Sequence, residues 1–82
     1  MPAAFLLQQI AWREKLEEHE DDLNALADLS AEVNVSYQAT ITELIEAIDR
    51  AGNYIRAAEL LRGLLFIDKF ATELDDVTAD LA

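Results

Sequence analysis

The chain has 82 residues, a hydrophobic content of 52% and a formal net charge of −11. This length allows one small domain with a single core, and the apolar content excludes a chain that stays disordered. The negative charge repels phosphate groups, so it excludes nucleic acid and anionic lipid as partners. The absence of cysteine excludes disulfides, thiol nucleophiles and cysteine-ligated metals.

The sequence carries no signal for membrane insertion or export. No stretch approaches the roughly 20 apolar residues that a membrane-spanning helix needs. Met1-Pro2 leads into Ala3 and Ala4 without the basic start and cleavage site of a secretory signal peptide. We therefore expect a cytoplasmic protein that has no membrane segment.

The first helix is predicted from Ala3 to about Glu18. Pro2 is tolerated at a helix start because its missing N–H has no partner there. The acidic cluster at 17–22 ends the helix, since like charges crowd a C-terminus whose dipole already disfavours anions. A helical wheel divides its apolar residues between two faces. One face holds Phe5, Trp12, Leu16 and His19, and the other, rotated by roughly 150°, holds Leu6, Leu7 and Ile10.

The second helix is predicted to begin after Asp21 or Asp22, either of which can cap it, and to end at Ala51-Gly52. β-Branched residues near its middle lower the helix propensity there, but the helical spacing of apolar residues continues through them. We therefore predict a continuous helix, and a kink or break near Asn34 is the alternative. Its core stripe is predicted to contain Leu23, Leu26, Ser30, Val33, Tyr37, Ile41, Leu44, Ile48 and Ala51.

The third helix is predicted to follow at once, with Asn53 as its cap. Phe66 and Phe70 add to an apolar surface that is too large for one stripe. Because the turn at Gly52 is tight, neighbouring helices run antiparallel. The fold class is therefore all-α, an antiparallel three-helix bundle with two long helices after a shorter first one. The apolar residues of the third helix include Tyr54, Ala57, Ala58, Leu61, Leu64, Leu65, Ala71, Leu74 and Leu81.

The residue types that carry catalysis or bind metals are not arranged for either task. His19 is the only histidine and lies among carboxylates, but a di-metal bundle needs Glu-x-x-His twice and Leu16 stands three residues before it. Ser30 and Ser36 lie in neither a nucleophile elbow nor a glycine-rich loop. We expect no enzyme activity, no metal and no cofactor, and we interpret His19 as a solvated residue at a helix end.

Charge is distributed unevenly along the chain. No lysine or arginine lies between Lys15 and Arg50, whereas acidic residues recur throughout that segment. One interpretation is a solvated outer face, and the other is a field that steers a basic partner.

The second apolar face of the first helix is the sharpest functional signal. Leu6, Leu7 and Ile10 share it with Glu14 and Glu17, so it combines apolar side chains with an acidic rim. This combination is typical of a helical interaction surface. The alternative is that the second helix covers these residues and buries them in the core.

Two segments resemble hallmarks of the HscB-type J-protein co-chaperones of iron–sulfur cluster assembly. Residues 5–18 are similar to the pattern Phe-Leu-Met-x-Gln-x-x-x-Arg-Glu-x-Leu-x-x, and residues 64–70 are similar to Leu-x-Phe-Leu-x-Lys-Leu. The spacing between the two segments also matches. The resemblance implies that residues 1–82 form a single domain, the family's C-terminal three-helix domain.

The resemblance also implies partners and contact residues. It implies binding of an IscU-type cluster scaffold and delivery of that scaffold to a DnaK-class chaperone ATPase. The family's J-domain stimulates this ATPase through a His-Pro-Asp tripeptide that the 82 residues lack, so we expect no stimulation by them alone. Glu14 and Arg13 would set the register at the rim of the contact. A structural module that self-associates as a homodimer through the surplus apolar face is the alternative. The implied scaffold contacts are Leu6, Leu7, Ile10, Glu14 and Phe66.

Overall fold

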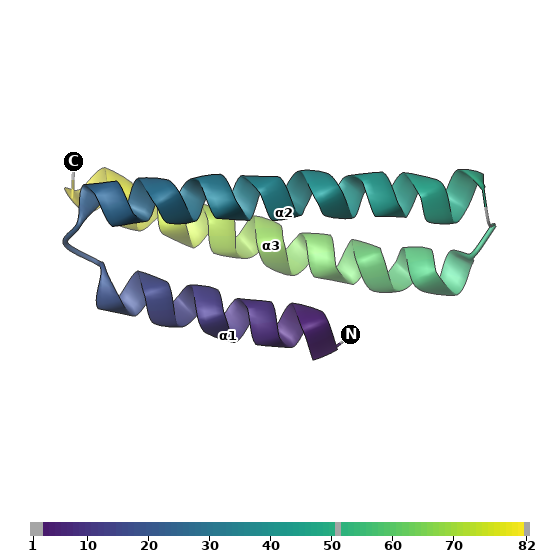
Figure 1. Ribbon diagram of the computed structural model, residues 1–82, viewed down its shortest axis with the longest axis horizontal. Helices are drawn as coiled ribbons and strands as arrows, with labels where there is room; N and C mark the ends of the chain where they lie inside the picture. The colour runs from purple at the N-terminus through teal and green to yellow at the C-terminus, as the bar shows by residue number, and fades with distance from the viewer. Residues whose placement is uncertain (1–2, 51, 82) are drawn as a thin grey trace.

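A computed structural model of the protein describes residues 3–50 and 52–81, which form three helices. Helix α1 spans Ala3–Glu18, α2 spans Leu23–Asp49 and α3 spans Tyr54–Leu81. The helices run antiparallel in chain order, and α2 and α3 form the long hairpin (Figure 1). The predicted all-α bundle with a shorter first helix is confirmed.

The length of α1 determines how much of the hairpin it can cover. At 1.5 Å per residue, its 16 residues span about 24 Å, whereas the 27 residues of α2 span about 40 Å. The end of the hairpin that carries the α2–α3 turn therefore extends past the N-terminus of α1 (Figure 1). The molecule is accordingly elongated, with extents of 44 × 19 × 15 Å.

The caps of α2 and α3 and the glycine between these helices are the residues that the sequence predicts. The Asp22 carboxylate accepts hydrogen bonds from the backbone N–H groups of Asn24 and Ala25 at 3.0 and 3.2 Å, which caps α2. Gly52 has a φ of +56°, a conformation that favours glycine. Asn53 Oδ1 accepts from the backbone N–H of Arg56 at 3.1 Å and caps α3.

The main core lies where all three helices meet. The ring centroids of Trp12 and Phe70 are 5.5 Å apart with a tilt of 31°, a geometry typical of favourable aromatic pairs. Aliphatic residues of all three helices surround this pair. The full set of buried residues in the cluster is Trp12, Leu16, Leu26, Leu29, Val33, Ile67, Phe70 and Leu74.

A smaller cluster of Ala47, Ala57 and Leu60 continues the core toward the α2–α3 turn. Phe5 packs against both clusters from the N-terminal end of α1. Its ring lies over Gly63, where an added Cβ would overlap the ring carbons. Gly63 is thus buried in the middle of α3 because α1 approaches the helix backbone closely at this point.

The core stripe predicted for α2 is partly wrong. Leu26 and Val33 are buried as expected, but Leu23, Ser30 and Ile48 are exposed, and Ala51 lies outside the described residues. The physical reason is that α2 contacts α1 as well as α3. Gln8 of α1 donates to Ser36 Oγ at 2.8 Å, and Lys15 Nζ pairs with Glu32 at 2.9 Å. Its buried face is therefore turned toward both neighbours and contains Leu26, Leu29, Val33, Thr40 and Ala47.

The third helix buries only some of the apolar residues named from its sequence, among them Ala57, Leu64 and Leu74. Tyr54, Leu61 and Leu65 are exposed, and Leu81 is exposed at the C-terminal end. The buried residues follow a three-and-four spacing that returns every seven residues, as in a coiled-coil seam. They are Ala57, Leu60, Gly63, Leu64, Ile67, Phe70 and Leu74.

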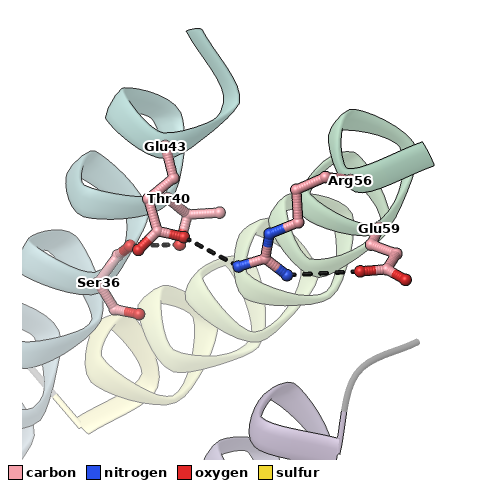
Figure 2. A network of polar contacts seen from close by, with 5 residues as sticks. All are labelled: Ser36, Thr40, Glu43, Arg56 and Glu59. Carbon is pink, nitrogen blue, oxygen red and sulfur yellow. Dashed lines mark hydrogen bonds and ion pairs between the residues drawn. The ribbon is translucent and has the colours of Figure 1, made fainter. Parts of the chain in front are cut away.

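The β-branched middle of α2 does not break the helix, which runs without interruption from Leu23 to Asp49. Thr40 is buried, and its hydroxyl donates to the carbonyl oxygen of Ser36 at 2.8 Å within the same helix. One helical turn beyond, Arg56 of α3 contacts Glu43 and Glu59, each at 3.4 Å (Figure 2). The Arg56–Glu43 pair connects α2 and α3, whereas the Arg56–Glu59 pair lies within α3, and each of these exposed pairs contributes at most about 1 kcal/mol.

We predict that Gly63→Ala destabilises the domain by about 1–2 kcal/mol. Overpacking against Phe5 costs about 1–3 kcal/mol, and the better helix propensity of alanine offsets up to about 1 kcal/mol of it. Urea unfolding followed by circular dichroism measures the change. In a Phe5→Ala background the same substitution should cost nothing, because the overlapping ring is gone, and an equal cost in both backgrounds would contradict the packing account.

Candidate protein-binding surface

The second apolar face of α1 is exposed. The exposed fractions are 50% for Leu6, 67% for Leu7 and 58% for Ile10. The alternative that α2 buries these residues is therefore wrong. The geometry explains why, since α1 is the outer helix of the bundle and buries only Trp12 and Leu16 fully. We call Leu6, Leu7 and Ile10 the α1 patch.

Phe66 of α3 lies beside one end of this patch. It is 45% exposed, whereas Phe70, one turn further along α3, is fully buried. Phe66 and Leu6 line the same groove between α1 and α3, with a volume of about 230 Å³. The structure thus brings together residues from both family motifs. We call this feature the α1–α3 groove, and its lining is Leu6, Gln9, Arg13, Phe66, Lys69, Phe70 and Glu73.

The remaining predicted contacts extend from the groove along α1 rather than lining it. Leu6, Ile10 and Glu14 recur every four residues, so they lie on one face of the helix. Leu7 is adjacent on the outer side and more exposed. The Glu14 carboxylate is exposed and forms no ion pair with the residues in the described ranges. An incoming partner would meet an apolar strip ending in an unpaired carboxylate.

Arg13, expected at the rim, is held by contacts within the domain. Its Nη2 lies 2.8 Å from Glu73 Oε2, and its guanidinium carbon lies 5.6 Å from the centre of the Phe70 ring. Both members of the ion pair are partly exposed, so the pair contributes little to stability. Its main effect is to fix the position of the Arg13 side chain across the end of the groove.

Gln9, Lys69 and Glu73 also line the groove, and the sequence reasoning missed them. For α3, the sequence contained a usable signal, because positions 66, 69, 70 and 73 have helical spacing and therefore lie on one face. On α1, Gln9 lies three residues after Leu6 and four before Arg13, so it faces α3 together with them. A polar residue between two apolar faces gives no hydrophobic signal.

Exposure alone does not single out the α1 patch. The part of the hairpin beyond α1 also carries exposed apolar residues, including Ile45, Ile48, Tyr54 and Ile55. The difference lies in shape and chemistry, because the α1 patch adjoins a groove with apolar walls and a charged rim. Protein-binding surfaces typically have this combination of an apolar centre, which loses water on binding, and a rim of polar groups.

The residues considered for catalysis or metal binding are not assembled into a site. His19 is exposed beyond the end of α1, and its Nε2 lies 3.9 Å from a Glu18 oxygen. Within residues 3–50 and 52–81, no three histidine or acidic side chains converge as a metal site would require. The described helices also include none that is both long and apolar enough to cross a membrane.

The structure is a three-helix bundle domain with an exposed apolar patch beside a groove. Comparison with known families supports a more specific assignment. Residues 1–75 match the family described as the HSCB C-terminal oligomerisation domain. The chain belongs to this family, which confirms the resemblance.

Curated relatives carry the same family name. Proteins named co-chaperone protein HscB homolog from Bordetella petrii and Bordetella avium are 36% and 39% identical over 74 residues, covering 90% of this chain and 44% of each relative. A protein of that name from Aeromonas hydrophila is 36% identical over 75 residues, 88% of this chain and 43% of the relative. The chain thus spans less than half the length of these relatives. No solved structure gives a significant match to it.

We predict that the α1 patch can be altered without loss of folding. Leu7→Ser and Ile10→Ser should each change the free energy of unfolding by at most about 0.5 kcal/mol, because both side chains already face solvent. Trp12→Ala should cost about 3–5 kcal/mol, because it empties the centre of the main core. Urea unfolding of the three variants tests this contrast. A large loss in either serine variant would mean that the patch is part of the core.

Proposed function

We propose that this domain is the scaffold-binding module of an iron–sulfur co-chaperone. In this proposal the α1 patch, Glu14 and Phe66 bind an IscU-type cluster scaffold protein. The observation that carries the proposal is that Leu6 and Phe66, which belong to the two separate family motifs, line one groove. The family match and the names of the relatives support the co-chaperone role.

Binding would be driven by burial of apolar surface. The α1 patch and Phe66 are each about half exposed or more, so a partner that covers them removes a substantial apolar area from water. Energetic hot spots are typically large side chains near the centre of such a contact. Phe66 beside Leu6 fits that description. Glu14, which is unpaired within the described part of the chain, would select a partner with a basic group at the edge of the contact.

The rest of the proposed role belongs to the whole protein. The curated relatives are more than twice as long as the matched segment. We propose that the remainder of such a protein delivers the bound scaffold to a DnaK-class chaperone ATPase. The domain would contribute to that delivery without being an enzyme itself, and it would act in the cytoplasm, where neither export nor membrane insertion is needed.

We predict that Phe66→Ala and Leu6→Ala each weaken scaffold binding by on the order of 30-fold, as expected for hot-spot residues of about 2 kcal/mol, and that the double variant weakens it further. The measurement is a calorimetric titration with an IscU-type scaffold. Leu61→Ala is the matched control, because Leu61 is 51% exposed and Leu6 is 50% exposed, but Leu61 is absent from the groove lining.

Helicity must be unchanged in all of these variants for the comparison to hold. Equal affinities for the Phe66→Ala variant and the unaltered domain would contradict the role of Phe66. A loss of affinity in Leu61→Ala as large as in Leu6→Ala would show that the contact is elsewhere.

Self-association is a second candidate function, favoured by the description of the family as an oligomerisation domain. The exposed α1 patch could pair with its equivalent on a second copy. If the domain self-associates, we predict that its sedimentation coefficient in analytical ultracentrifugation rises with protein concentration. The Ile10→Ser substitution should abolish this rise. A domain that sediments as a monomer at every concentration would exclude this function.

A further inference from the structure

Gln9 lines the α1–α3 groove, and its side-chain amide nitrogen is buried beside it. Its Nε2 atom is buried and forms no hydrogen bond with any residue that the structure describes. An amide nitrogen carries two N–H donors, and a buried donor that stays unpaired opposes folding. An apolar side chain of similar size would avoid that cost. The domain on its own therefore gives no stability reason for glutamine at this position.

The other polar groups of the groove are also mainly donors. Its lining contains the cations of Arg13 and Lys69 and one carboxylate, that of Glu73, which is paired with Arg13. The groove therefore has a net positive charge, although the whole domain has a net charge of −11. Leu6, Phe66 and Phe70 supply apolar surface between these groups. This chemistry suits an apolar group that has an oxygen acceptor next to it.

The size of the groove indicates how much of a partner it can hold. A dry cavity of about 150 Å³ accommodates a benzene ring. The groove, at about 230 Å³, therefore has room for one large apolar side chain together with part of its backbone.

We infer that the α1–α3 groove binds one apolar side chain of the partner, and that Gln9 Nε2 donates a hydrogen bond to an oxygen acceptor beside that side chain. Gln9 is in this account a specificity-determining residue. This inference rests on the proposed function and deepens it. A partner with the apolar side chain but no adjacent acceptor would leave the Gln9 donor unpaired in a drier environment, and the groove would discriminate against it.

The test is the variant Gln9→Met, which keeps the length of the side chain and removes the donor. Calorimetric titration with an IscU-type scaffold protein should show an affinity about tenfold lower. Thermal unfolding of the free variant should show a midpoint equal to or above that of the unaltered domain. A residue that merely supports packing would not combine lower affinity with undiminished stability.

Two further variants complete the experiment. Gln38→Met is the matched control, because Gln38 is an exposed glutamine of α2 that is absent from the groove lining, and its affinity should be unchanged. Gln9→Glu keeps the shape of the side chain but replaces the donor with a carboxylate, and it should weaken binding at least as much as Gln9→Met.

Several results would overturn the inference. Affinities of Gln9→Met and Gln9→Glu within twofold of the unaltered domain would show that Gln9 does not contact the partner. Loss of affinity together with a lower thermal midpoint in both variants would assign Gln9 to packing. If the unaltered domain itself does not bind the scaffold, the proposed function fails and this inference fails with it. Binding that both Gln9 variants leave intact overturns the inference alone.

Discussion

The packing of Trp12 against Phe70 determines where the first helix lies on the bundle. It anchors the short helix α1 to the long α2–α3 hairpin at the point where all three helices meet. A helix on the outside of a bundle can bury only one face, so anchoring α1 through Trp12 and Leu16 leaves Leu6, Leu7 and Ile10 in solvent. The contact that anchors α1 therefore also leaves its apolar patch exposed.

This anchoring also shapes the α1–α3 groove. Phe70 contributes to the main core and at the same time to the lining of the groove, and Arg13 lies over its ring while pairing with Glu73. At the other end of α1, Phe5 lies over Gly63 and brings the two helices close together. The position of Leu6 relative to Phe66 thus follows from two contacts in the interior. A binding surface built on packed helices keeps its geometry in the free state, so less ordering is needed when a partner binds.

The sequence predicted the elements well because their boundaries depend on local chemistry. Asp22, Gly52 and Asn53 act on the backbone within a few residues, and each does what its residue type indicates. The exposed face of α1 was also predictable, because one short helix cannot bury two apolar faces. Which side of α2 is buried was not predictable from its own residues. It depends on how both α1 and α3 pack against this helix, and with that packing Ser30 and Ile48 are exposed while Thr40 and Ala47 are buried. The position of Gln9 in the groove was not predictable for the same reason, because the groove forms only when α3 packs beside α1.

We propose that a partner docks on the α1 patch rather than on the exposed end of the hairpin. Isoleucine methyl groups report on both regions, because Ile10 lies in the patch while Ile45, Ile48 and Ile55 are exposed toward the α2–α3 turn. The most direct measurement is an NMR titration of the isoleucine-methyl-labelled domain with an IscU-type scaffold protein. We expect the Ile10 methyl signal to shift or broaden at substoichiometric concentrations of the scaffold, while the Ile55 signal stays unchanged. Perturbation of Ile45, Ile48 and Ile55 with an unchanged Ile10 signal would contradict the proposal.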